Sequence, residues 1–219
     1  MRVICPHNNQ VHPRTADAIA RYAPETVYLE NTGLDGYDEN ISAYWDGSDD
    51  LVVIEQDKEI TDEVLPAFRR CNQDWCSFAY RNFPEPYRKR VYTGLGCSFY
   101  SATIQRLVPP SEFTGPDPAW HPECKLCDGK GCWRTLDTRI AVSLVKRGIV
   151  THVHGEIAHH HEYPEPVQWV RELVNTFKPD ERLLQVASVC PACRSSLMFV
   201  NAGLNCSKCD FATIRDTDG

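Results

Sequence analysis

The chain has 219 residues, of which 42% are hydrophobic and 24% charged, and its formal net charge at pH 7 is −7. This composition is typical of a globular domain of ordinary size and excludes a disordered chain. No apolar run approaches the roughly 20 residues that a membrane-spanning helix needs, and the acidic balance argues against nonspecific binding to a polyanion. Because no secretory segment precedes the first apolar run, we expect a cytoplasmic protein whose eleven cysteines serve metal ligation more than disulfides.

The N-terminal part alternates strand and helix signals. An apolar run at residues 3–5 predicts a strand, and a helix is expected from Pro13 to just before Pro24. A second strand is expected at 26–29. The continuous apolar run at 51–54 is typical of a strand buried on both faces, and Thr61 can cap a helix through residue 68.

The middle of the chain gives weaker signals. Residues 72–118 are rich in proline and aromatic residues, so we expect mostly irregular structure apart from a helix at 101–107. A helix headed by Thr135 or Asp137 and closed by Gly148, a strand at 149–154 and an amphipathic helix at 166–177 then follow. This alternation predicts an α/β fold with a largely parallel sheet, which binds its ligand beyond the carboxyl ends of the strands.

Two groups of cysteines have the spacing of zinc sites. Cys190, Cys193, Cys206 and Cys209 form two knuckles around a strand and a turn at 201–203, which predicts a zinc ribbon over residues 188–219. A redox dithiol pair is the alternative. A second group predicts a small structural zinc loop at about 119–133, with a flexible insertion carrying unligated thiols as the alternative; its members are His121, Cys124, Cys127 and Cys132.

The four other cysteines lack such spacing. Cys5, Cys71, Cys76 and Cys97 are therefore expected to be small buried apolar residues. Since a closed four-ligand zinc site has no open position, the two zinc ions would explain stability, and the chemistry must lie elsewhere.

Carboxylates and histidines are expected at the strand ends. Glu55 and Asp57 follow the strand at 51–54 and would point the same way, which suits Mg²⁺ or Mn²⁺ shared with phosphates, or else an ordinary acidic loop. Five of the eight histidines lie late in the chain, and at least one is expected to ligate the metal, the alternative being solvent-facing histidines; they are His152, His154, His159, His160 and His161.

Several stretches, in chain order, resemble a known enzyme family. Residues 49–61 resemble the metal-binding strand of nucleotide-sugar glycosyltransferases with the GT-A fold, and Cys5-Pro6-His7-Asn8 resembles the first-strand exit of their inverting, family-two-like members. Residues 28–33 resemble the second-strand exit, 94–100 the glycine-containing stretch before the acceptor-side helix, and 133–137 the segment whose acidic residue heads a helix. The resemblance covers roughly residues 2–162.

The resemblance implies a compact GT-A-like, Rossmann-like domain at 1–187. In such a domain Asp137 would be the catalytic base, and the metal would be held by Glu55, Asp57 and a subset of the histidines 152, 154, 159 and 161. The nucleotide would lie against the strand exits, at Pro6, His7, Asn8, Glu30, Asn31, Glu55 and Asp57.

The leading hypothesis is therefore a Mn²⁺- or Mg²⁺-dependent transferase. It would move a sugar from a nucleoside-diphosphate sugar to an acceptor hydroxyl of a protein, glycan or nucleic acid. One alternative is a zinc-ribbon binding module for nucleic acid or protein, with an inactive α/β domain. The other is a metal-dependent nucleotidyltransferase or hydrolase that uses the same carboxylates and histidines.

Overall fold

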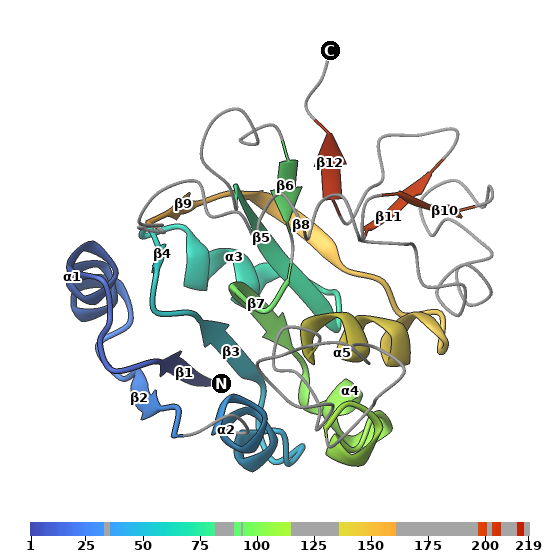
Figure 1. Cartoon of the computed structure of the whole chain (residues 1–219), viewed down its shortest axis with the longest axis horizontal. Coiled ribbons are helices and arrows are strands. Elements are labelled where there is room, and N and C mark those ends of the chain that lie inside the picture. The colour runs from blue at the N-terminus through green and yellow to red at the C-terminus, as the bar shows by residue number, and fades with distance from the viewer. Residues whose placement is uncertain are drawn as a thin grey trace, which may run out of the picture.

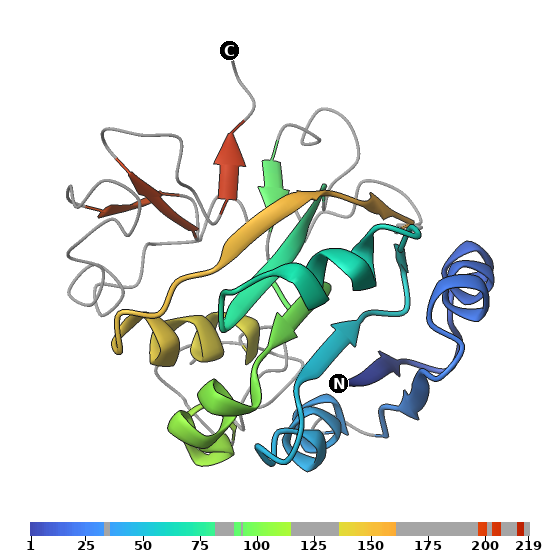
Figure 2. The same ribbon diagram turned by 180° about the vertical axis from the view of Figure 1, so that it is seen from behind.

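The computed structural model describes residues 1–32, 36–81, 90–92, 94–114, 136–160, 197–200, 203–206 and 214–216. These residues form a mixed α/β structure with a central, mostly parallel sheet and helices on both of its faces (Figures 1 and 2). In the described part of the chain no helix is long and apolar enough to cross a membrane.

The centre of the sheet consists of six neighbouring strands. Their spatial order is β2-β1-β3-β7-β5-β8; every neighbouring pair is parallel except the two that β7 makes. The carboxyl ends of all strands but β7 therefore lie at one edge of the sheet. The strands are β1 (Arg2–His7), β2 (Val27–Glu30), β3 (Leu51–Ile54), β5 (Trp75–Arg81), β7 (Cys97–Tyr100) and β8 (His152–Glu156).

The other strands extend this sheet or form short pairs. β6 pairs with the end of β5 and with β12, β4 pairs with β9, and β10 pairs with β11, each pair antiparallel. Their bounds are β4 (Lys58–Glu59), β6 (Arg90–Tyr92), β9 (Ala158–His159), β10 (Leu197–Val200), β11 (Gly203–Cys206) and β12 (Ile214–Asp216).

Helices cover the two faces of the sheet and enclose two apolar cores. α1 (Pro13–Tyr22) and α3 (Val64–Arg70) pack on the face to which Val52 and Ile54 point. α2 (Gly36–Tyr44), α4 (Ala102–Leu107) and α5 (Leu136–Val145) pack on the face of Leu51 and Val53, and a 3₁₀ helix, η2 (Pro110–Glu112), follows α4.

Strand β3 is the centre of both cores because none of its four side chains is exposed. Fully burying a side chain of this kind stabilises the fold by about 1.5–3 kcal/mol. An isolated apolar run of four residues can be placed this deep only if both faces are covered, as the sequence predicted. The residues that follow β3 are therefore held at a fixed position on the edge of the sheet.

The sequence-based prediction is confirmed for the parallel core and wrong in two segments. The expected strands at 3–5, 26–29 and 51–54 correspond to β1, β2 and β3, and the expected helices at 101–107 and from 137 correspond to α4 and α5. The polar segment at 36–44 forms helix α2, which was not expected. The described part of residues 72–118 is not mostly irregular, because it includes β5, β6 and β7.

Several predicted features lie outside the described residues. They are the helix at 166–177 and the zinc loop at 119–133, together with Cys190, Cys193 and Cys209 of the ribbon. Within the predicted ribbon, β10 and β11 form an antiparallel hairpin, and Cys206 is the last residue of β11. β12 pairs with β6 of the main sheet. The division of the chain at residue 187 stays a prediction.

Candidate functional site

Three linked asparagines lie at the carboxyl ends of β1 and β2, and we call them the asparagine ladder (Asn8, Asn31 and Asn40). Asn8 follows β1, Asn31 follows β2, and Asn40 reaches them from α2 (Gly36–Tyr44). The Asn31 backbone N–H donates to the His7 carbonyl at 2.8 Å, and the Asn31 side-chain amide donates to Asn8 Oδ1 at 3.0 Å. Asn40 Nδ2 donates to Asn31 Oδ1 at 2.9 Å and to the Glu30 carbonyl at 3.0 Å. The three side chains form a polar surface at the carboxyl ends of β1 and β2, which is where parallel α/β sheets bind their ligands.

Helix α2 fixes the ladder from one side. Its first residue, Gly36, packs so closely that a Cβ there would lie 2.9 Å from the carbonyl carbon of Asn31. On the other side, the Asn8 backbone N–H donates to the side chain of Gln56, which follows β3. The ladder is thus tied to the exits of all three parallel strands.

The other predicted nucleotide-binding residues surround the ladder. Pro6 is buried within β1, whereas the side chain of Glu30 is exposed at the end of β2. The ring of His7 lies 6.4 Å from the ring of Tyr28, and His7 Nδ1 is buried without a hydrogen-bond partner among the described residues. The structure therefore brings Pro6, His7, Asn8, Glu30 and Asn31 to one edge, as predicted from the sequence.

Beyond β3 the chain forms a partly buried group of charges, which we call the charge cluster (Glu55, Asp57, Lys58 and His159). The Lys58 side chain is only 2% exposed, and its Nζ pairs with Asp57 and lies 3.4 Å from Glu55 Oε2. His159 Nε2 lies 3.0 Å from Asp57 Oδ2. The pairing of β4 with β9, which sets Lys58 opposite His159, explains why a residue far along the chain reaches Asp57.

The charge cluster keeps the Asp57 carboxylate ionised. Burial disfavours the charged form of Asp57, but the hydrogen bond from His159 and the charge of Lys58 outweigh it, so the pKa of Asp57 lies well below its usual range. Burial and the charges of Glu55 and Asp57 raise the pKa of the neighbouring Cys5 thiol to about 12. This thiol is therefore protonated and unreactive at neutral pH.

Two tyrosines connect the charge cluster to other elements. Tyr37 of α2 donates its hydroxyl to Glu55 Oε1 at 2.5 Å, and the ring of Tyr80 in β5 lies 4.3 Å from Lys58 Nζ. Burial raises the pKa of both phenols, and the charges of Glu55 and Asp137 raise it further. Both hydroxyl groups therefore stay protonated near neutral pH and are hydrogen-bond donors.

Asp137, the predicted base, lies in the first turn of α5 and reaches the same region. A Cβ placed on Gly94 would be 2.5 Å from Asp137 Oδ2 and 3.0 Å from the Tyr80 hydroxyl oxygen, so all three groups adjoin. Leu136, which is completely buried, anchors the start of the helix in the core. The fold thus sets a third carboxylate beside the edge that carries Glu55.

Gly96 allows these groups to pack closely. A Cβ at this position would overlap the Tyr80 ring and the Lys58 side chain. The Gly96 carbonyl also accepts a hydrogen bond of 2.9 Å from the Glu55 backbone N–H, so the segment before β7 aligns Glu55. The glycines at 94 and 96 therefore leave the space that Asp137, Tyr80 and Lys58 occupy.

The histidines predicted as metal ligands separate into two places. His159 joins the charge cluster, and His161 lies outside the described residues. His152 and His154, in contrast, lie at the start of β8, where their rings stack on each other at 4.6 Å. At about 3.3 Å per strand residue, the five steps from His154 to His159 span roughly 16 Å.

His154 belongs to a second group, which we call the thiol–imidazole cluster (Cys71, Cys76 and His154). One potential ligand atom from each residue lies within 4.8 Å of the others. Burial, together with His152 and Arg70, lowers the pKa of His154. In the described part of the chain, no group of three ligands at this spacing combines His152 or His154 with Glu55 or Asp57.

The charge cluster already contains a cation between its carboxylates. Because the Lys58 ammonium group pairs with both Glu55 and Asp57, the point where a divalent ion would bridge them is taken. A protein Mg²⁺ or Ca²⁺ site needs several oxygen ligands, and in the described part of the chain no group of three ligand atoms at metal-binding spacing includes Glu55 or Asp57. These residues alone therefore do not form a divalent-cation site.

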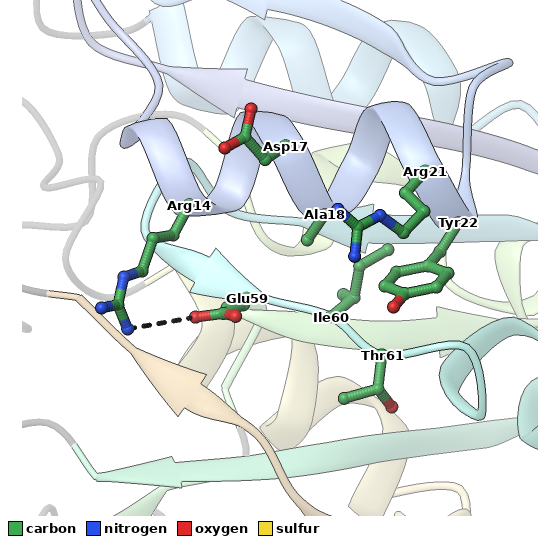
Figure 3. A pocket seen from close by; sticks show the side chains of 8 residues that line it. All are labelled: Arg14, Asp17, Ala18, Arg21, Tyr22, Glu59, Ile60 and Thr61. Atoms are coloured by element: carbon green, nitrogen blue, oxygen red, sulfur yellow. Dashed lines mark ion pairs between the residues drawn. The ribbon is translucent and has the colours of Figure 1, made fainter.

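A shallow pocket of about 250 Å³ lies apart from these groups, between α1 and β4 (Figure 3). Arg14 approaches Glu59 at 4.0 Å across it, and Arg21 and Tyr22 line its other end. Neither the asparagine ladder nor Glu55 or Asp57 lines this pocket, so we place the candidate site at the strand ends.

Comparison with known proteins assigns no family. No protein-family model matches the sequence, and no curated protein matches it. Among solved structures, that of A197 from STIV is similar with a TM-score of 0.46 and 13% sequence identity, over 72% of this chain and 83% of that chain. A similarity at this level does not identify what the chain does.

Sequence reasoning missed four contributors to the site. Lys58 directly follows Asp57 and could have been recognised as a competing cation, whereas Asn40 and Tyr37 lie on the helix that was not expected. Tyr80 lies in an aromatic, apolar run that was taken for irregular structure. Strand signals in that run were the available clue.

Proposed function

We propose that the protein is a glycosyltransferase that moves a sugar from a nucleoside-diphosphate sugar to an acceptor hydroxyl. The observation that carries the proposal is the position of Asp137. This carboxylate lies far along the chain from β3, yet it adjoins Gly94 and Tyr80 beside the edge where Glu55 follows β3. A general base next to the ligand edge of a parallel sheet is the arrangement that such a transfer needs.

The asparagine ladder supports binding of the nucleotide part of the donor. Its amides and the nearby His7 offer donors and acceptors at the ends of β1 and β2. Amide groups can recognise the edges of a base and the hydroxyl groups of a ribose without adding charge. The diphosphate would then extend toward the exit of β3, and the sugar toward Asp137.

The transfer step requires no unusual protonation state. Asp137 takes the proton of the acceptor hydroxyl while the acceptor oxygen bonds to the anomeric carbon. The bond from that carbon to the diphosphate oxygen breaks, and its electron pair leaves with the nucleoside diphosphate. The hydroxyl of Tyr80, which stays protonated, adjoins Asp137 at Gly94, and a fixed polar neighbour of this kind helps to hold the base in position. Tyr37 uses its single proton in the hydrogen bond to Glu55.

A divalent metal remains part of the proposal only as a prediction. Glu55, Asp57 and Asp137 outnumber the single ammonium group of Lys58, so a bound diphosphate would benefit from additional positive charge. No step above passes through a metal, because the described residues do not form its site. Assays with Mn²⁺, with Mg²⁺ and with a chelator test the requirement.

The finer description of the fold is part of the same proposal. We infer a GT-A-like domain over residues 1–187, with a zinc loop at about 119–133 and a zinc ribbon over 188–219. The parallel order of β2, β1 and β3 supports the GT-A-like domain, and the hairpin of β10 and β11, which ends at Cys206, supports the zinc ribbon. Elemental analysis for zinc tests the two cysteine groups.

The direct test is turnover of a panel of nucleoside-diphosphate sugars with Mn²⁺ or Mg²⁺ present. We expect one donor to be cleaved with release of a nucleoside diphosphate, and Asp137→Asn to lower kcat by about 10²–10⁴-fold, as loss of a general base does. Asp17→Asn is the matched control, since Asp17 is exposed on α1. Folded protein that neither binds nor cleaves any donor would rule the proposal out, and release of pyrophosphate would identify a nucleotidyltransferase instead.

A further inference from the structure

We propose that the thiol–imidazole cluster is a zinc site, with Cys71, Cys76 and His154 as protein ligands. It is separate from the charge cluster and does not depend on the proposed transferase activity. Two cysteines and a histidine are a ligand set that strongly favours Zn²⁺ over Mg²⁺ or Mn²⁺. Neither the sequence spacing nor any comparison assigns this site.

Three elements bring the ligands together. Cys71 follows the last turn of α3, where its backbone N–H donates to the carbonyls of Ala67 and Phe68. Cys76 is completely buried near the start of β5. β8 runs parallel to β5, and the pairing of Cys76 with His152 fixes the position of His154 two residues further along.

Spacing within the cluster suits a shared metal ion. The potential ligand atoms of the three residues lie within 4.8 Å of one another. Zinc bonds of about 2.0–2.3 Å set neighbouring ligand atoms roughly 3.5–4 Å apart in a tetrahedron, so only small side-chain adjustments are needed. A tetrahedral ion takes a fourth ligand, and the exposed His152, whose ring stacks on that of His154, is a neighbouring imidazole.

The state of His154 distinguishes this cluster from ordinary packing. Its Nε2 atom is buried and has no hydrogen-bond partner among the described residues. A buried polar atom without a partner costs about 1–3 kcal/mol. The rings of Phe78, stacked at 5.4 Å, and Phe68, edge-on at 5.8 Å, hold the imidazole in place. Zinc ligation would satisfy the imidazole and the two thiolates together.

The test is peptide-resolved alkylation of Cys71 in the full-length protein. Cys71 is half-buried, so its thiol can be followed by mass spectrometry independently of the cysteines predicted to bind zinc elsewhere. With Zn²⁺ present we expect Cys71 to react at least about tenfold more slowly than after chelation, because a ligated thiolate is protected from reaction. His154→Ala should remove this protection while zinc is still present, and His154→Cys should restore it.

Matched controls separate ligation from folding. His12→Ala removes a half-buried histidine outside the cluster and should leave Cys71 protected. Labelling of the buried Cys97 reports loss of the fold, so only labelling of Cys71 without Cys97 counts as loss of the ligand. Elemental analysis should find about one zinc fewer per chain in Cys71→Ser than in Cys97→Ser, as expected for removal of one ligand of a single ion.

Three results would overturn the proposal. The first is equal labelling of Cys71 with and without zinc in folded protein. The second is a His154→Cys variant that behaves like His154→Ala. The third is a disulfide between Cys71 and Cys76 in protein isolated without reductant, which would make the pair a redox element rather than a zinc site.

Discussion

The charge cluster and the thiol–imidazole cluster both contain side chains that can bind a cation. They differ in whether a positively charged side chain is already paired with those side chains. In the charge cluster, Lys58 pairs with two carboxylates and a hydrogen bond joins Asp57 to His159. In the thiol–imidazole cluster, His154 Nε2 is buried with no partner among the described residues. The first cluster thus carries its own cation, whereas the second has ligand atoms that a cation would satisfy.

This difference bears on two predictions from the sequence, both of which stay open. Glu55 and Asp57 were expected to hold a metal, and Cys71 and Cys76 were expected only to fill space. Ligand type alone does not decide where a metal binds, because a neighbouring ammonium group can replace the ion. The predictions below test whether each cluster depends on its cation.

Removal of Lys58 should have the largest effect. Lys58→Met keeps the apolar stem but leaves the half-buried Glu55 and Asp57 without their cation, which should lower the free energy of unfolding by about 3 kcal/mol, the low end of the cost of breaking a buried pair. Lys146→Met, at an exposed position, is the control and should have little effect. Chemical denaturation measures both. A Lys58→Met protein as stable as wild type would mean that the ion pairs do not hold the cluster together.

Zinc should have the next largest effect, and on the other cluster. At a free zinc concentration of 100 times Kd, one site stabilises the folded state by about 2.7 kcal/mol. Thermal unfolding measured with and without zinc should therefore show that zinc stabilises Cys71→Ser less than Cys97→Ser, by about this amount. If zinc stabilises the two variants equally, Cys71 is not a zinc ligand and the thiol–imidazole cluster does not depend on a cation.

The loss of stability caused by Asp57→Asn should depend on pH, which tests the ionised state of the charge cluster. At pH 7 the loss of charged hydrogen bonds should cost about 2 kcal/mol. Because the folded-state pKa of Asp57 is lowered, its contribution is complete above the unfolded pKa, near 3.9, and is lost as the pH falls through the folded value. The difference between wild type and variant should be constant at neutral pH and shrink below about pH 5. A difference that grows toward acid pH would contradict the lowered pKa.

The sequence predicted those parts of the site that are local in the chain. Glu55 and Asp57 follow a strand whose four apolar residues identify it as buried on both faces, and Asp137 heads a helix with a clear apolar stripe. These patterns depend only on neighbours in sequence. For the same reason the strand exits at Asn8 and Asn31 were found.

Contacts between distant segments were beyond such reasoning. His159 reaches Asp57 through the pairing of β4 with β9, and His154 reaches Cys76 through the register of β5 with β8. Both depend on which strands pair, and the sequence around Cys76 gave no strand prediction. Helix α2 was missed because only Gly36 and Ile41 are buried along it, so no apolar stripe marks it.

The smallest stability effect, and the most specific test of the proposed base, comes from two glycines. A Cβ at Gly94 would lie 2.5 Å from Asp137 Oδ2, whereas a Cβ at Gly155 in β8 would meet Phe78 only at 3.8 Å. Gly94→Ala should therefore cost about 1 kcal/mol through overpacking. Since a small displacement of a catalytic group can reduce turnover about 10²-fold, its loss of activity should be out of proportion to that cost. Gly155→Ala should change neither stability nor activity. If both glycine variants retain full activity, the Asp137 carboxylate beside Gly94 is not the base.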